Sequence, residues 1–333
     1  MAAGQVVDLN GIPFFDLSQA GGKFVSSLTF FDDGEWRIWF NLGEGKYIES
    51  KGWPAEGFYY SKSRERETDL YFHFLDFIAQ KASYQEIIKP LNGLHDDLFN
   101  LSASLAKISH IHLTKDSLGS GDSRMVITEI EYMFSVCRSM IDLFQEIAAQ
   151  LWGKVKLFGE SPAEQKKLRK SFSDMIWYKD RLTNEEELKT RFGLPPLWAD
   201  FYMRHAEFFL QIKRFRDRIV HNGSQVQTIF SGEDGYLVNS DFKPFIGMNI
   251  WVEADKQVND LVPLMPALGM VAYKTIMMCN DFSFMIEKTI KYPSSLVPGM
   301  NLYMRGFFDE HFLKVLMDAE SRVHEQMDRS VKE

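Results

Sequence analysis

The 333-residue sequence has few cysteines and lacks long apolar runs. Two cysteines, Cys137 and Cys279, exclude a disulfide framework, and their apolar helical surroundings predict buried free thiols. No stretch of about 20 apolar residues predicts a membrane span. The N-terminus has no basic patch followed by an apolar run, so no secretory signal is indicated. These absences favour a cytoplasmic protein that does not enter a membrane.

Sequence motifs for nucleotide, metal and serine-hydrolase chemistry are also missing. The chain contains no glycine-rich phosphate loop, no G-x-S-x-G elbow and no dinucleotide fingerprint, so no cofactor is expected. His110 and His112 suggest a metal, but on a helix their rings diverge. Only His95 precedes them nearby, and neither a cysteine nor an H-E-x-x-H spacing accompanies them. No metal site is therefore predicted.

The charge balance is acidic, with 46 acidic against 38 basic side chains and a net charge of −8. A broad nucleic-acid surface is disfavoured, because non-specific affinity depends on the number of phosphates that the protein neutralises. Any contact with RNA must then be local. The residues available for it are Lys213, Arg214, Arg216 and Arg218, whereas the basic run 166–170 is more typical of a solvated helix face.

The first sixty residues predict a small β-rich N-terminal element, residues 1–60. Residues 24–31 and 36–42 are β-prone runs, and Asp32-Asp33-Gly34-Glu35 between them is a hairpin signal. From residue 61 onward the apolar residues recur at helical spacing. We therefore predict a mainly α protein in which residues 61–333 form one helical domain.

Breaks and periodicity divide this helical domain. Gly119 to Ser123 precede a long helix expected from Met125 to Trp152, and a second helix is expected at about 197–221. These two helices are expected to pack together. A short β-hairpin over 228–238 follows the second helix, and a final long helix is expected from Ala267 to Lys291.

The run Arg216-Asp217-Arg218-Ile219-Val220-His221-Asn222-Gly223 is the most specific feature of the chain. Apolar residues and one histidine recur every three or four positions before it, and Asn222-Gly223 is typical of a helix end. His221 then lies in or beside the last turn, where the helix dipole favours its protonated form. The residues of that stripe are Trp198, Phe201, His205, Phe208, Ile212, Phe215 and Ile219.

This run resembles the R-x-x-x-x-H motif of HEPN domains, with Arg216, Asp217 and His221 matching the arginine, the polar residue and the histidine. The resemblance implies an all-helical, HEPN-like bundle that dimerises and places two motifs in one cleft. It also implies metal-independent cleavage of RNA, in which the 2′-hydroxyl attacks the adjacent phosphate. Family members of this kind often act as toxins or in antiviral defence.

The spacing of Arg216, Asp217 and His221 limits which of their side chains can contact each other on one helix. Arg216 and His221 are five positions apart and point about 140° away from each other on an ideal helix. Their convergence requires a long arginine reach, a helix that ends before His221, or a dimer axis. Asp217 and His221 are four apart, so a hydrogen bond that orients the imidazole is expected. Glu131 and Arg138 are a candidate supporting polar pair.

Two functions remain open. In the first, the chain is an endoribonuclease in which His221 is general acid or base, Arg216 stabilises the phosphate and Asp217 orients one of them. A homodimer is then expected, with an apolar rim of Phe201, Phe208, Ile212 and Phe215. For a toxin, an antitoxin is a candidate protein partner. In the second, a non-catalytic module binds a protein or a nucleotide through an aromatic-rich surface, and the motif is a structural salt bridge and helix cap.

Overall fold

The computed structural model describes residues 3–154, 157, 165–222 and 228–330. More than half of these residues are helical, and the strands form three separate sheets. The chain divides into two compact units. Unit 1 contains residues 1–94, 143–202 and 279–308, and unit 2 contains residues 95–142, 203–278 and 309–333.

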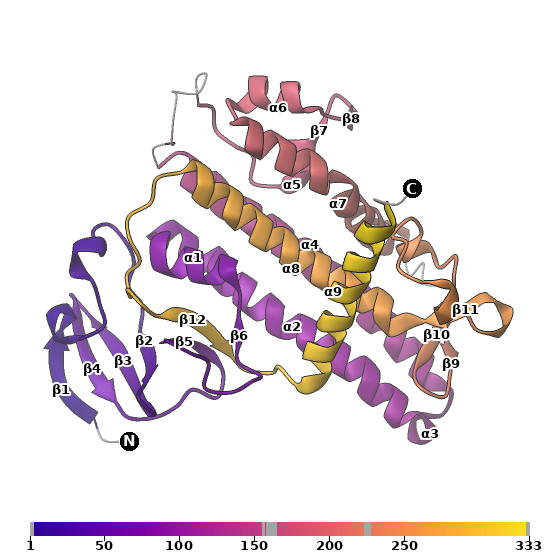
Figure 1. Cartoon of the computed structure of the whole chain (residues 1–333), viewed down its shortest axis with the longest axis horizontal. Helices are drawn as coiled ribbons and strands as arrows, with labels where there is room; N and C mark the ends of the chain where they lie inside the picture. Colours follow the sequence, from indigo (N-terminus) through magenta and orange to yellow (C-terminus); the bar gives the residue numbers. More distant parts are fainter. Residues whose placement is uncertain (1–2, 155–156, 158–164, 223–227, 331–333) are drawn as a thin grey trace. The chain divides into compact units, whose positions relative to one another are not determined.

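Unit 1 contains a seven-stranded mixed sheet with the strand order β1-β4-β3-β2-β5-β12-β6. Neighbouring strands run antiparallel except β2 and β5, which are parallel. In Figure 1, β12 lies beside β5 although it comes from the C-terminal part of the chain. The strands are β1 (Ala3–Asp8), β2 (Leu28–Asp32), β3 (Glu35–Gly43), β4 (Lys46–Ser50), β5 (Gly57–Ser61), β6 (Leu70–Tyr71) and β12 (Asn301–Arg305).

The predicted fold class is therefore wrong. The chain is not a mainly α, all-helical HEPN-like bundle with a small β appendage, because the sheet has seven strands and takes β6 and β12 from beyond residue 60. The expected first hairpin is confirmed as β2 and β3. Asp33 and Gly34 between them have φ of 49° and 79°, the left-handed pair that a tight two-residue hairpin turn requires.

Helical residues of unit 1 bury large aromatic rings. Phe201 stacks on Phe282 with ring centroids 4.6 Å apart, and the Trp152 and Trp198 rings lie 4.7 Å apart. The indole N–H of Trp198 donates to Thr289 Oγ1 over 2.6 Å, so its polar atom is satisfied inside the core. The shorter elements of this unit are α1 (His73–Lys81), α5 (Phe172–Ile176), β7 (Trp177–Tyr178), β8 (Arg181–Leu182) and α6 (Glu185–Phe192).

Four long helices contribute residues to both units: α2 (Ile88–Leu113), α4 (Asp122–Trp152), α7 (Pro196–Asn222) and α8 (Leu264–Thr289). The expected helices at 125–152, 197–221 and 267–291 are confirmed as α4, α7 and α8. Within unit 2 the Phe134 and Phe215 rings lie 4.4 Å apart, so the predicted packing of α4 against α7 is also confirmed.

Unit 2 further contains a small sheet of order β11-β10-β9 and a C-terminal helix. The predicted second hairpin is confirmed, since Leu237 of β10 pairs with Phe230 of β9. Cys137 and Cys279 are both buried free cysteines, as expected. The elements not yet named are α3 (Lys115–Leu118), β9 (Phe230–Ser231), β10 (Tyr236–Asn239), β11 (Leu261–Pro263) and α9 (Glu310–Ser330).

Candidate functional site

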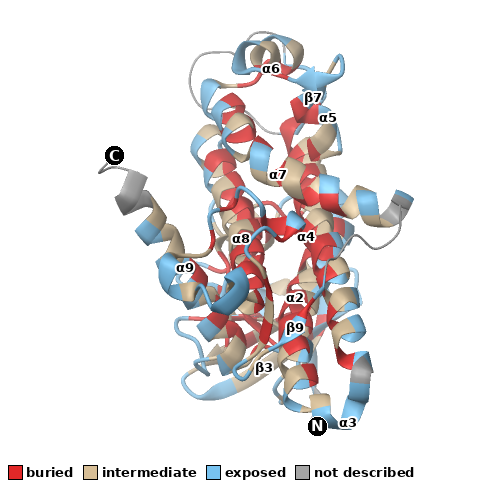
Figure 2. Cartoon of the chain, turned by 90° about the vertical axis from the view of Figure 1, so that its right-hand side faces the viewer, coloured by how far each residue is buried: buried red, intermediate tan, exposed pale blue. Residues whose placement is uncertain are grey.

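The motif residues lie in the last two turns of α7. In the apolar stripe before them, Ile212 is fully buried and Phe215 is 5% exposed, whereas Phe208 and Ile219 have intermediate exposure. Arg214, Arg218 and His221 are exposed, whereas Lys213, Arg216 and Asp217 are half-buried. Figure 2 shows this change along α7 from buried to intermediate and exposed positions. Solvent and a polyanion can therefore reach the cationic end of the helix.

Asp217 is the centre of the local ion pairs. Its Oδ2 lies 3.3 Å from Lys213 Nζ, and its Oδ1 accepts a hydrogen bond from Arg216 Nη1 over 3.3 Å. Within the described ranges, no hydrogen bond joins Asp217 to His221, so the contact predicted from their spacing is not made in this structure. Lys213 and His221 are each four residues from Asp217 and share its face of the helix, and the contact that forms is the one to Lys213.

Helix α7 continues through His221 to Asn222. Because the helix does not end earlier, Arg216 and His221 project in directions about 140° apart, and one straight helix does not bring their functional atoms together. Gly223, which was expected to close the helix, lies outside the described residues. A site that uses both side chains on one phosphate therefore requires the reach of the arginine stem or a second chain.

The stripe predicted to form an apolar dimer rim is mostly internal. Phe201 and Ile212 are fully buried and Phe215 is 5% exposed, while Phe208 has intermediate exposure. Phe215 packs on Phe134 of the same chain. These side chains are therefore occupied by intramolecular packing, and any dimer contact must use other residues.

Glu131 and Arg138 do not pair with each other in this structure. Arg138 Nη2 lies 3.0 Å from Asp142 Oδ2, and its guanidinium lies 4.1 Å from the Phe209 ring centroid. Arg138 is 14% exposed, so these contacts tie it into the packing between α4 and α7. Glu131 Oε1 is buried and has no hydrogen-bond partner among the described residues.

His110 and His112 take different environments. His110 is exposed, whereas the His112 ring packs edge-on against Tyr236 at 5.2 Å, and its Nε2 lies 3.0 Å from the backbone oxygen of Gly232. In the described part of the chain, no group of three His, Cys, Asp or Glu side chains is arranged to hold a metal ion.

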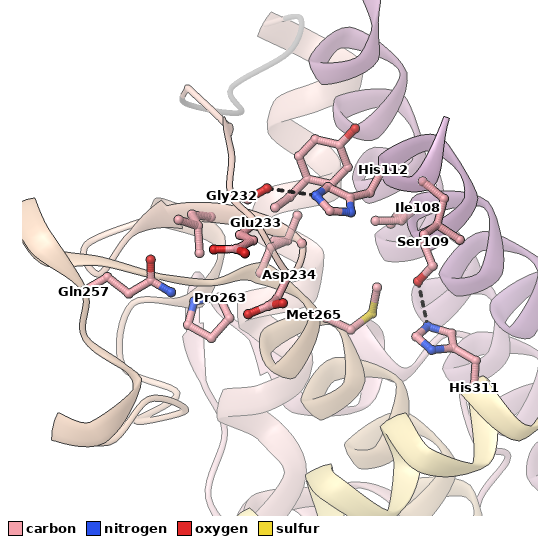
Figure 3. A pocket seen from close by; sticks show the side chains of 15 residues that line it. Ile108, Ser109, His112, Gly232, Glu233, Asp234, Gln257, Pro263, Met265 and His311 are labelled. Atoms are coloured by element: carbon pink, nitrogen blue, oxygen red, sulfur yellow. Dashed lines mark hydrogen bonds between the residues drawn. The ribbon is translucent and has the colours of Figure 1, made fainter. Parts of the chain in front are cut away.

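Sequence patterns did not reveal a cavity of about 370 Å³ in unit 2. Its wall comes from the C-terminal part of α2, the β9–β10 turn, the segment where β11 leads into α8, and the start of α9 (Figure 3). The polar side chains that line it are Ser109, His112, Glu233, Asp234, Tyr236, Gln257 and His311. The apolar ones are Ile108, Leu113, Leu237, Pro263, Leu264 and Met265.

Hydrogen bonds order this cavity wall. Ser109 Oγ and His311 Nε2 are 2.8 Å apart, which links α2 to the first turn of α9. The Gly232 carbonyl accepts from Lys115 Nζ at 3.0 Å, and the Tyr236 hydroxyl donates to Asp122 Oδ2 at 3.0 Å. Burial raises the pKa of Tyr236, so the phenol stays protonated. Ser109, His112, Tyr236 and His311 are thus held in place on the cavity wall.

Comparison of the chain with protein-family models, with curated proteins and with solved structures found no match. Among the described helices, none combines the length and apolar character that crossing a membrane requires. Any functional assignment therefore depends on the side chains described above.

Proposed function

We propose that the chain is a metal-independent endoribonuclease whose chemistry resides at the C-terminal end of α7. The observation that carries the proposal is the concentration of accessible cationic side chains around His221 on a protein of net charge −8. Arg214 and Arg218 make no ion pair within the described ranges, so both are available for phosphate groups. This helix end is a local site for a polyanion on an otherwise acidic chain.

The proposed reaction is a transesterification. His221 takes the proton of a ribose 2′-hydroxyl, the 2′-oxygen forms a bond to the adjacent phosphorus, and the bond from phosphorus to the 5′-oxygen breaks. A second imidazole, protonated, supplies the proton that the departing 5′-oxygen needs. Arg216 stabilises the charge that develops on the phosphate oxygens through paired hydrogen bonds. The products are a 2′,3′-cyclic phosphate and a 5′-hydroxyl.

A dimer satisfies this reaction better than one chain. Each chain has one His221, and its Arg216 points to a different face of α7, so a single helix lacks both the second imidazole and the convergent arginine. Two α7 ends related by a two-fold axis supply two histidines and two arginines to one cleft. Asp217, which contacts Arg216, then serves to hold the arginine side chain.

The decisive experiment is RNA cleavage in the presence of EDTA by the purified full chain. We expect single-stranded RNA to be cut with a 2′,3′-cyclic phosphate end, and His221→Ala and Arg216→Ala each to abolish cleavage. The matched controls are His324→Ala and Arg124→Ala, which change an exposed histidine and an exposed arginine elsewhere and should leave cleavage intact. Cleavage that requires added magnesium, or that survives both motif substitutions, overturns the assignment.

Mixing the parent chain with His221→Ala tests the shared site. Heterodimers of the two keep only one imidazole in the common cleft, so an excess of the inactive variant should suppress cleavage by the parent chain. A site contained within one chain predicts that the parent chain keeps its full activity in the mixture. For substrate binding, Arg214→Ala and Arg218→Ala should each reduce the slope of log affinity against log salt by about 0.7 for single-stranded RNA.

A further inference from the structure

The cavity of unit 2 presents polar groups on two sides of an apolar middle. Figure 3 shows Glu233, Asp234 and Gln257 on one side, and Ser109 with His311 on the other, with the Met265 side chain between Asp234 and the Ser109–His311 pair. At about 370 Å³ the cavity falls within the range of small-molecule sites, which typically combine apolar walls with a few placed polar groups.

The charge of the cavity selects the sign of its occupant. Glu233 and Asp234 both line it, and within the described residues neither carboxylate takes part in an ion pair or hydrogen bond. Lys115 does not line the cavity, but its Nζ lies 3.0 Å from the Gly232 backbone oxygen and 3.2 Å from Nε2 of His112, both lining residues, so two carboxylates face one nearby ammonium. A cation is therefore attracted, and a ligand that carries phosphate or carboxylate is repelled.

The opposite side offers a hydrogen-bonding pair. Ser109 and His311 hold each other at 2.8 Å, and together they contain a hydroxyl and an imidazole, which both donate and accept. Between the two sides, Ile108, Leu264 and Met265 line the wall with apolar surface. The flexible thioether of Met265 adapts to an inserted ring or chain.

We propose that this cavity binds a small organic amine. The protonated amino group lies at Glu233 and Asp234, an apolar body contacts Ile108, Leu264 and Met265, and a hydroxyl at the far end exchanges hydrogen bonds with Ser109 and His311. This site is separate from the α7 end and its occupation does not require RNA cleavage. Nucleotides are disfavoured as occupants, because their phosphates would lie beside the two carboxylates.

Calorimetric titration of the full chain tests the proposal with four probes that share one aromatic body: tyramine, 2-phenylethylamine, 2-phenylethanol and 3-phenylpropionate. We expect tyramine to bind most tightly, followed by 2-phenylethylamine, with at least about a fivefold loss for the alcohol and no binding of the anion. Equal affinity for amine and alcohol, or no binding of either amine at millimolar concentration, overturns the proposal.

Substitutions locate the two ends of the ligand. Glu233→Gln and Asp234→Asn should each weaken binding of both amines by about two- to fivefold, whereas Glu320→Gln, an exposed acid outside the cavity, should not. Ser109→Ala should remove the advantage of tyramine over 2-phenylethylamine, about two- to tenfold. Binding that is unchanged in all three cavity variants refutes the site. His221→Ala should bind the amines normally, which separates this result from the ribonuclease test.

Discussion

Replacing Arg305 should destabilise unit 1 far more than an ordinary charge deletion. This side chain is 3% exposed on β12, and its Nε and Nη2 donate to Asp69 Oδ1 and Oδ2 over 3.0 and 2.6 Å. Its guanidinium also lies 4.6 Å from the Trp36 ring centroid. Arg305→Met leaves Asp69, which is 2% exposed, without its buried cation. We expect the free energy of unfolding to fall by about 3–5 kcal/mol.

Urea unfolding followed by circular dichroism measures this loss. Arg37→Met is the matched control, because Arg37 pairs with Glu35 in the same sheet but the pair is exposed, so its loss should cost about 0–1 kcal/mol. A double variant, Arg305→Met with Asp69→Asn, should recover part of the stability, since the unpaired buried charge is gone while the amide oxygen can still accept from the Tyr59 hydroxyl and the Arg66 N–H. Two results would show that the buried pair does not hold β12 in the sheet. In one, Arg305→Met lowers the free energy of unfolding no more than Arg37→Met does. In the other, the loss in the double variant equals the sum of the losses from its two single substitutions.

Three further predictions concern single buried positions. Burial lowers the pKa of Lys23 from 10.5 to about 8, and its Nζ donates to the Gln80 oxygen. The unfolded chain therefore binds the proton more strongly than the folded chain between these two values, so stability should rise with pH across this window, by up to about 3 kcal/mol. Urea midpoints at pH 8 to 10 should show this rise in the parent chain and a smaller one in Lys23→Met. Gly269→Ala should lower the thermal midpoint, because the new Cβ would lie 2.6 Å from Val315 Cγ1 and 3.1 Å from Val315 O. We expect the free energy of unfolding to fall by about 1–3 kcal/mol. An unchanged midpoint means that α9 shifts freely. Burial raises the pKa of the Cys137 thiol to about 12, so a thiol-specific disulfide reagent at pH 8 should modify it only after unfolding, and rapid modification of the folded chain contradicts this burial.

Local patterns were sufficient for three of the long helices, α4, α7 and α8, and for the two hairpins. The three- and four-residue spacing of α7 and α4 arises within each helix, and the Asp33-Gly34 turn requires only the left-handed conformation of two adjacent residues. The same patterns did not predict the sheet. Strand β12 pairs with β5, placing Leu302 opposite Tyr60, and nothing in either short strand specifies a partner so distant in the chain.

The two candidate sites divide in the same way. At the end of α7, the sequence by itself placed Arg216, Asp217 and His221 on one helix, because their order and spacing belong to a single continuous segment. It did not decide that Lys213 and Arg216 would take Asp217, since several neighbours compete for one carboxylate.

Only the tertiary structure decided the cavity. Ser109, Asp234 and His311 are far apart in the chain and carry no common motif, and they line one cavity because α2, the β9–β10 turn and α9 pack together within unit 2. Hydrophobic periodicity shows which face of a segment is buried. It does not show which other segment covers that face, because this depends on packing over the whole unit. For this reason the sequence alone determined helices and a motif, and the folded chain determined the seven-stranded sheet and the cavity.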